Sequence, residues 1–83
     1  MHAIYHRNRI DIIASILEVA NGNEVKQVEI LNKANITHAI FKECLFFVLQ
    51  YGLIEYIRFQ RTYRTTTKGI HFLSICDKMK NLI

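Results

Sequence analysis

Proline is absent from the 83-residue chain, and glycine occurs only at Gly22, Gly52 and Gly69. Because these two residue types interrupt regular structure most strongly, their scarcity leaves few places where a helix or strand must stop. The sequence also has no low-complexity linker, internal repeat or block of like charge that would separate it into parts. We therefore expect a single domain over residues 1–83.

Long apolar runs are missing too. The longest, residues 44–49, is far shorter than the ~20 residues that a helix needs to cross a bilayer. The first residues lack the long apolar centre of a signal peptide. The only two cysteines, Cys44 and Cys76, form no short motif, which favours buried thiols in a reducing cytosol. These features predict a cytoplasmic protein with no membrane contact.

Groups suited to catalysis are scarce. Only seven residues are acidic, and none of them are paired at a spacing typical of acid–base catalysis. The sequence has no glycine-rich phosphate loop, and its histidines are scattered at His2, His6, His38 and His71. His2 and His6 would meet only if the N-terminus were helical, and two histidines alone make an incomplete metal site. We therefore expect a protein that is not an enzyme and that has no metal, cofactor or small-molecule ligand.

Hydrophobic residues, in contrast, make up 51% of the chain, and the net charge is +4 with a pI near 9.3. The basic balance suits an anionic partner, either nucleic acid or a membrane surface. The apolar excess has two explanations, an unusually apolar core or an apolar surface that meets a second subunit. We favour the second explanation.

Helical spacing of apolar residues predicts three helices, over about residues 7–20, 25–34 and 38–51. Thr37 can cap the third helix by accepting a hydrogen bond from an early backbone N–H. Gly52 follows that helix in the position favoured by a C-terminal glycine. The short connection between the second and third helices is typical of a helix-turn-helix.

Residues 53–65 are rich in β-branched and aromatic residues, which predicts a β-hairpin with Gln60 and Arg61 at its tip. A last helix is expected over residues 67–81. Three helices followed by a two-stranded wing and a further helix define a mainly α fold with a β-hairpin, the winged helix-turn-helix.

Four segments carry a family resemblance in the expected order. They are residues 9–18, 30–37, 51–54 and 63–69. With these segments the chain resembles the small archaeal winged-helix DNA-binding proteins, a group with Sulfolobus chromatin proteins and predicted archaeal transcriptional regulators. The resemblance implies a DNA-binding winged helix that dimerises through its last helix. Thr65 departs from the relatives, which tend to have an apolar residue there. A chain that stops at Ile83 is also too short for the long C-terminal coiled coil of the Sulfolobus protein.

The third helix of a helix-turn-helix enters the major groove of DNA with its N-terminal residues at the base edges. The residues expected to meet DNA there are Thr37, His38, Ala39, Phe41 and Lys42. The first turns of this helix contain no Arg, Asn or Gln, the residues that read bases best. We therefore expect modest sequence specificity and an affinity that comes mainly from phosphate contacts.

The wing contributes a second set of expected DNA contacts: Arg58, Gln60, Arg61, Tyr63 and Arg64. Guanidinium groups suit phosphates and the narrow minor groove. The alternative is a hairpin whose charged face is merely solvated.

Phe46 lies on the side of the third helix opposite its apolar face. Three roles are open for it: local packing, a protein contact, or a wedge near DNA.

Two apolar surfaces exceed what one small domain is expected to bury. On the first helix they comprise Ile12, Ile16 and Val19, and on the last helix Phe72, Ile75, Cys76, Met79, Leu82 and Ile83. Burying these residues between two copies would produce a two-fold homodimer with two recognition helices. The sequence thus predicts a nucleoid-associated, double-stranded DNA-binding protein, most simply a transcriptional regulator. The alternatives are a protein-interaction module and a non-specific DNA-compacting chromatin protein.

Overall fold

The computed structural model describes residues 8–81. Within this range the elements follow one another as α1 (Arg9–Val19), α2 (Gln27–Ala34), α3 (His38–Gln50), β1 (Ile54–Ile57), β2 (Thr62–Thr65) and α4 (Thr67–Asn81). The strands β1 and β2 form an antiparallel hairpin between α3 and α4. The predicted winged-helix architecture, mainly α with a β-hairpin, is confirmed.

Local side-chain chemistry sets several helix ends. The Asn8 side chain accepts a hydrogen bond from the Asp11 N–H at 2.8 Å, and Thr37 Oγ1 accepts from the Ile40 N–H at 3.2 Å. Both interactions satisfy N–H groups that the first turn of a helix leaves without a partner. Asn35 ends α2 in the left-handed conformation, with φ of 55°. The third helix therefore starts where its cap predicts.

The second helix begins at Gln27, two residues later than expected, because Val25 belongs to the wing. Its backbone pairs with Tyr63 of β2, with N–H to O distances of 2.9 Å from Val25 and 2.7 Å from Tyr63. This isolated bridge adds a third strand-like segment beside β2. It ties the connection between α1 and α2 to the base of the wing.

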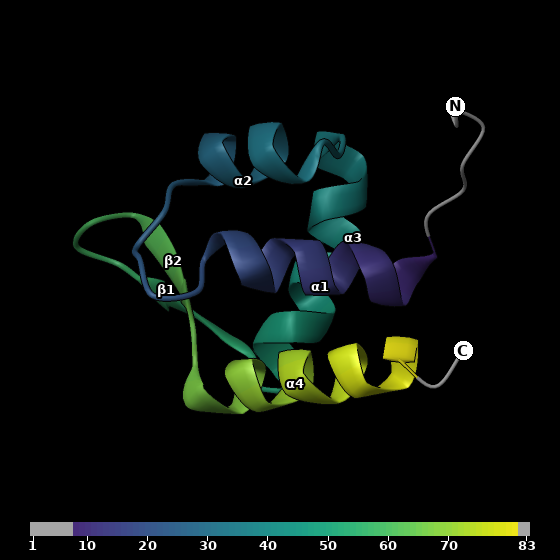
Figure 1. Cartoon of the computed structure of the whole chain (residues 1–83). Helices are drawn as coiled ribbons and strands as arrows, with labels where there is room; N and C mark the ends of the chain where they lie inside the picture. The colour runs from purple at the N-terminus through teal and green to yellow at the C-terminus, as the bar shows by residue number, and fades with distance from the viewer. Residues whose placement is uncertain (1–7, 82–83) are drawn as a thin grey trace.

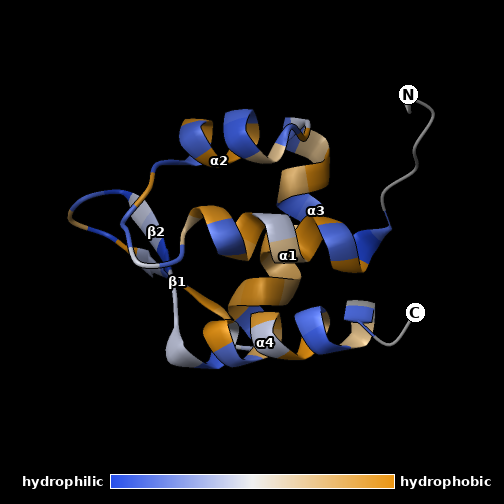
Figure 2. Cartoon of the chain, viewed as in Figure 1, coloured by the Kyte–Doolittle hydropathy of each residue, from blue (hydrophilic) through white to orange (hydrophobic). Residues whose placement is uncertain are grey.

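The first helix lies at the centre of the molecule. Figure 1 shows α2 on one side of α1 and α4 on the other, with α3 crossing close by. Figure 2 shows apolar residues recurring along α1 and α3. Ile12 and Ile16 are only 8% and 0% exposed, and Val19 is partly buried against the same core. The prediction that these three residues form a dimer interface is therefore wrong, because the neighbouring helices of the same chain cover them.

Thr65 is a polar residue at a position where the resembling proteins tend to have an apolar one. Its side chain is buried, and its Oγ1 donates a hydrogen bond to the Leu17 carbonyl oxygen at 2.7 Å. Its backbone N–H donates to the Ala20 carbonyl oxygen at 2.9 Å. A buried hydroxyl is tolerated when it is hydrogen-bonded, so Thr65 joins the wing to the end of α1 without an unsatisfied polar group.

Candidate nucleic-acid interface

The outer face of α3 is exposed along its whole length. His38, Ala39 and Lys42 lie on this face in the first two turns and are all exposed. Phe46 and Leu49 continue it with 71% and 41% of their surface exposed. Residues three and four apart share one side of a helix, so these side chains form one continuous surface. Thr37 is also exposed, although its hydroxyl caps the helix.

Phe41 and Tyr63 correct two of the predicted DNA contacts. Phe41 is fully buried and Tyr63 is 9% exposed, so neither side chain presents a surface to a large ligand. The two rings instead meet edge to face, with centroids 5.9 Å apart and planes at 82°. Burial, with a smaller contribution from Tyr56, raises the pKa of Tyr63. This contact holds the first turn of α3 beside the wing.

The register of the hairpin separates its two faces. Tyr56 pairs with Tyr63, and Glu55 pairs with Arg64. Directly opposed residues share a face and successive residues alternate, so Glu55 and Arg64 lie on the face away from Phe41. The tyrosine face, in contrast, lies toward α3.

Arg64 is therefore a wing residue whose charge is already compensated. Its Nη2 lies 2.9 Å from Oε2 of Glu55, and its Nη1 lies 3.9 Å from Oε2 of Glu24. Its Nε also donates to Glu55 at 3.1 Å. Arg64 is still exposed, so its contact with DNA stays a prediction, and two carboxylates would compete with DNA for its guanidinium group.

Arg58 and Arg61 belong to the four-residue turn, residues 58–61, that joins β1 to β2. The Arg61 N–H donates to the Arg58 carbonyl oxygen at 3.3 Å, and Arg61 adopts a φ of 55°. The predicted tip, Gln60 and Arg61, is thus part of a longer turn. Both arginines are exposed, and no acidic side chain among residues 8–81 pairs with either of them.

Lys26 adds a third positive charge to the tip. Its Nζ donates to the Gln60 carbonyl oxygen at 3.5 Å, across the gap between the start of α2 and the wing. The sequence gives no specific sign of this contact, because Lys26 precedes Gln60 by 34 positions. Predicting this contact would require knowledge of the backbone bridge between Val25 and Tyr63, which brings Lys26 next to the wing.

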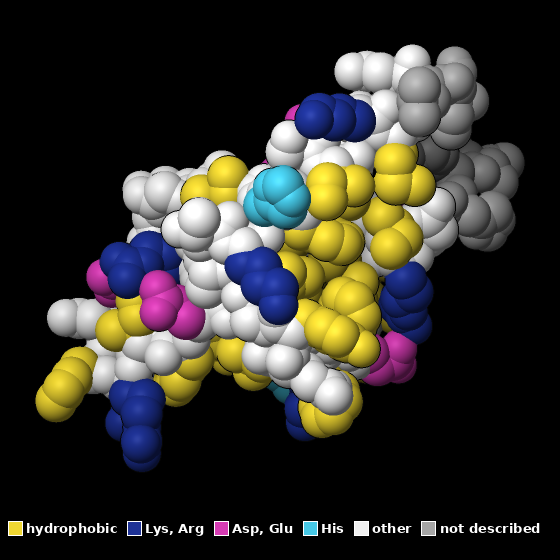
Figure 3. Space-filling view, turned by 90° about the horizontal axis from the view of Figure 1, so that it is seen from below, with side chains coloured by type: hydrophobic (Ala, Val, Ile, Leu, Met, Phe, Trp, Pro, Cys, Tyr) yellow, Lys and Arg dark blue, Asp and Glu magenta, His cyan; other side chains and the backbone are white. Residues whose placement is uncertain are grey.

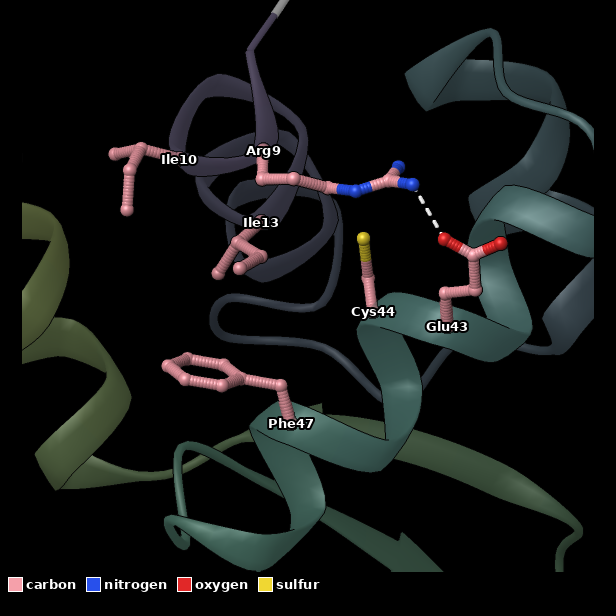
Figure 4. Close-up of a pocket in the computed structure, with 6 residues that line it drawn as sticks. All are labelled: Arg9, Ile10, Ile13, Glu43, Cys44 and Phe47. Carbon is pink, nitrogen blue, oxygen red and sulfur yellow. Dashed lines mark hydrogen bonds and ion pairs between the residues drawn. The ribbon is translucent and has the colours of Figure 1, made fainter.

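A hollow lies between α1 and α3, away from the wing. Figure 4 shows the side chains that line it: Arg9, Ile10, Ile13, Glu43, Cys44 and Phe47. Arg9 and Glu43 form an ion pair at its edge. Burial raises the pKa of the Cys44 thiol, although the Arg9 guanidinium opposes the rise. The part of the chain that the structure describes contains no cluster of His, Cys, Asp and Glu suited to a metal ion.

The predicted dimer residues of α4 have different environments. Cys76 is only 7% exposed and Phe72 packs against the core, so these two belong mainly to the monomer. Ile75 and Met79 remain 44% and 58% exposed. Leu82 and Ile83 lie outside the described residues. Figure 3 shows apolar side chains gathered on the face seen from below, the side on which α4 lies.

Family comparison agrees with this geometry. Residues 6–83 match the family described as winged helix-turn-helix, so the chain belongs to that family. Comparison with curated proteins gave no match. Domains of this family are typically DNA-binding. Between residues 8 and 81, none of the helices has the length and apolar character required to traverse a bilayer.

Proposed function

We propose that the protein binds double-stranded DNA, with the start of α3 in the major groove and the wing tip on the flanking duplex. One observation carries this proposal. His38 and Lys42 are exposed on α3, uncompensated Arg58 and Arg61 are exposed on the wing, and the contact of Phe41 with Tyr63 fixes the two elements side by side. Exposed basic side chains on two adjoining elements form a surface that suits a polyanion.

The exposed surface of α3 supports binding of modest sequence specificity. Apart from Glu43, which pairs with Arg9, its first two turns offer only His38 and Lys42 as long polar side chains. Lys42 approaches a phosphate or base as a point charge. Phosphate contacts fix position on the duplex but carry little sequence information. A nucleoid-associated transcriptional regulator, rather than an enzyme, is the role we propose. The archaeal origin implied by the sequence resemblance stays a prediction.

Binding to a random-sequence duplex at increasing salt tests the proposal directly. For the wild type, the logarithm of affinity should fall linearly with the logarithm of salt concentration. A variant with Arg58→Ala and Arg61→Ala should bind more weakly and lose roughly two units of that slope, because each phosphate contact contributes about 0.9. Fluorescence anisotropy of a labelled duplex provides the measurement.

The matched control replaces two exposed lysines of α4, Lys68 and Lys78, with alanine. It removes the same charge from another surface and should keep nearly the wild-type slope. Equal effects of the two double variants would mean that net charge, and not the wing, governs binding. A wild type that binds no duplex would favour protein docking through Phe46 and Leu49, the exposed apolar residues of α3.

We also propose that two copies pair through α4. Ile75 and Met79 lie one helical turn apart and are both exposed, and Ile10 of α1 is 48% exposed. A second copy can cover these side chains with the same apolar surface, as a two-fold interface requires. Such a dimer would present two α3 helices to a pseudo-palindromic site.

A further inference from the structure

The wing tip carries an aromatic side chain that the fold leaves uncovered. Phe59 is 101% exposed, the highest value among the large apolar residues that the structure describes. It lies in the turn of residues 58–61, directly after Arg58 and two positions before Arg61. A single exposed apolar residue is ordinary on a protein surface. Phe59 differs because it stands at the tip of the wing between two exposed arginines.

Hydrogen bonds hold the backbone of the turn that carries this ring. The hydrogen bond from the Arg61 N–H to the Arg58 carbonyl oxygen closes the turn, and Lys26, the residue before α2, donates to the Gln60 carbonyl oxygen. At the base of the turn, Thr62 Oγ1 donates to Oε1 of Glu24 at 3.1 Å. These contacts tie the tip to the body of the domain at several points.

The proposed dimer does not cover Phe59. In Figure 1 the loop between β1 and β2 lies at one end of the molecule, and α4 ends at the other. Ile75 and Met79 belong to the later turns of α4, so a copy seated on them leaves the wing tip open. Phe59 therefore stays accessible to another partner in the proposed dimer.

The charges around Phe59 indicate the chemistry of its partner. Arg58 and Arg61 are the first and last residues of the turn, and Lys26 contacts it from outside. The nearby carboxylates Glu24 and Glu55 bind Arg64. A narrow minor groove has an enhanced negative potential that attracts arginine. Proteins that bind this groove also insert apolar side chains between base steps, which unstacks the bases and kinks the duplex.

We propose that Phe59 is a wedge that enters the minor groove between Arg58 and Arg61 and inserts at a base step. This inference rests on the proposed DNA binding and adds to it a site of insertion and a bend. Pyrimidine–purine steps unstack most easily, so they are the favoured sites of insertion.

A single tryptophan tests the insertion, because the chain contains none. In the Phe59→Trp variant, saturating duplex should at least halve the indole emission through stacking and should reduce quenching by acrylamide several-fold. A Ser74→Trp variant, at an exposed position on α4, serves as the control and should show neither change. Emission at position 59 that stays fully open to acrylamide in the bound complex would overturn the proposal.

A Phe59→Ala variant separates the wedge from the charges. Its affinity for duplex should fall about ten-fold, within the range known for base–aromatic stacking, while the salt slope stays at the wild-type value. Energy transfer between dyes at the two ends of the duplex should show a bend of tens of degrees with wild type and little bend with the variant.

The two proposals fail in different ways. Wild-type binding with an unchanged bend and affinity in Phe59→Ala overturns the wedge and leaves DNA binding intact. Absence of wild-type binding to any duplex overturns both, and it leaves Phe59 as a residue for contact with a protein.

Discussion

Close backbone packing at Gly69 links the last helix to the wing. A Cβ atom at this position would lie 2.1 Å from the Leu53 carbonyl oxygen and 2.6 Å from Cγ2 of Thr65. The first of these atoms is backbone, and it also accepts the Thr66 N–H at 3.0 Å, so it cannot simply rotate away. The start of α4 can therefore approach Leu53, the residue before β1, this closely only because residue 69 has no side chain.

We expect Gly69→Ala to destabilise the fold by about 1–3 kcal/mol, as overpacking of a tight contact typically does. This loss exceeds the gain of about 1 kcal/mol that alanine normally gives in a helix. Urea unfolding followed by circular dichroism measures the change. Lys68→Ala, at the exposed neighbouring position, should be nearly neutral. A Gly69→Ala variant as stable as the wild type would show that the helix can move away from β1 at little cost.

The raised pKa of Cys44 predicts a stability that depends on pH. Burial favours the neutral thiol in the fold, so its contribution is complete below the usual value of 9.0 and is lost as the pH rises through the folded pKa. Between pH 8 and pH 10.5, the wild type should lose more unfolding free energy than Cys44→Ala. Urea unfolding under reducing conditions gives both values. Parallel losses in the two proteins would mean that the thiol is not the titrating group.

At the scale of single elements, the wing divides its arginines between structure and binding. Arg64 is held by Glu55 and Glu24, whereas Arg58 precedes the exposed tip without an acidic partner among the described residues. Arg58→Ala should weaken duplex binding several-fold, and Arg64→Ala should change it less than two-fold. Exposed ion pairs contribute only about 0–1 kcal/mol, so the second change should also alter stability little. Anisotropy titrations at one salt concentration compare the duplex affinities of the two variants. A larger loss of affinity in Arg64→Ala than in Arg58→Ala would contradict the assignment of Arg58 to binding and Arg64 to structure.

The helices and the hairpin are predictable from the sequence because their signals are local. Apolar spacing sets the helices, Thr37 caps α3, and the β-branched run after Gly52 predicts the first strand. The bridge of Val25 to Tyr63 has no such signal, since a single paired residue has no periodicity. The site is less predictable, because whether Phe41 points outward depends on where the wing packs against α3.

The errors in the predicted dimer surface have a related cause. Two apolar faces on one helix predict two neighbours, but they do not reveal whether a neighbour belongs to the same chain. Ile12 and Ile16 are covered within the monomer because α1 lies among the other helices. Phe59, in contrast, alternates with polar residues after Ile57 as a strand residue would, and only the folded turn shows that it is exposed.

At the scale of the whole molecule, pairing through α4 predicts a solution mass of twice the monomer's 9.8 kDa. Replacing Ile75 and Met79 with glutamate should return the mass to that of a monomer, because charge would then face charge across an apolar interface. Sedimentation equilibrium measures the mass. Ile70→Glu, at another exposed position of α4, should leave the dimer intact. A wild type that is monomeric at high concentration would contradict the proposed pairing.

The central claim is that the start of α3 and the tip of the wing contact the same duplex at the same time. Amide chemical shifts recorded while a short duplex is added test this claim most directly. We predict the largest changes at residues 37–42 and 58–61, with little change along the later turns of α4. Changes confined to α4, or changes at α3 with none at the wing, would contradict it.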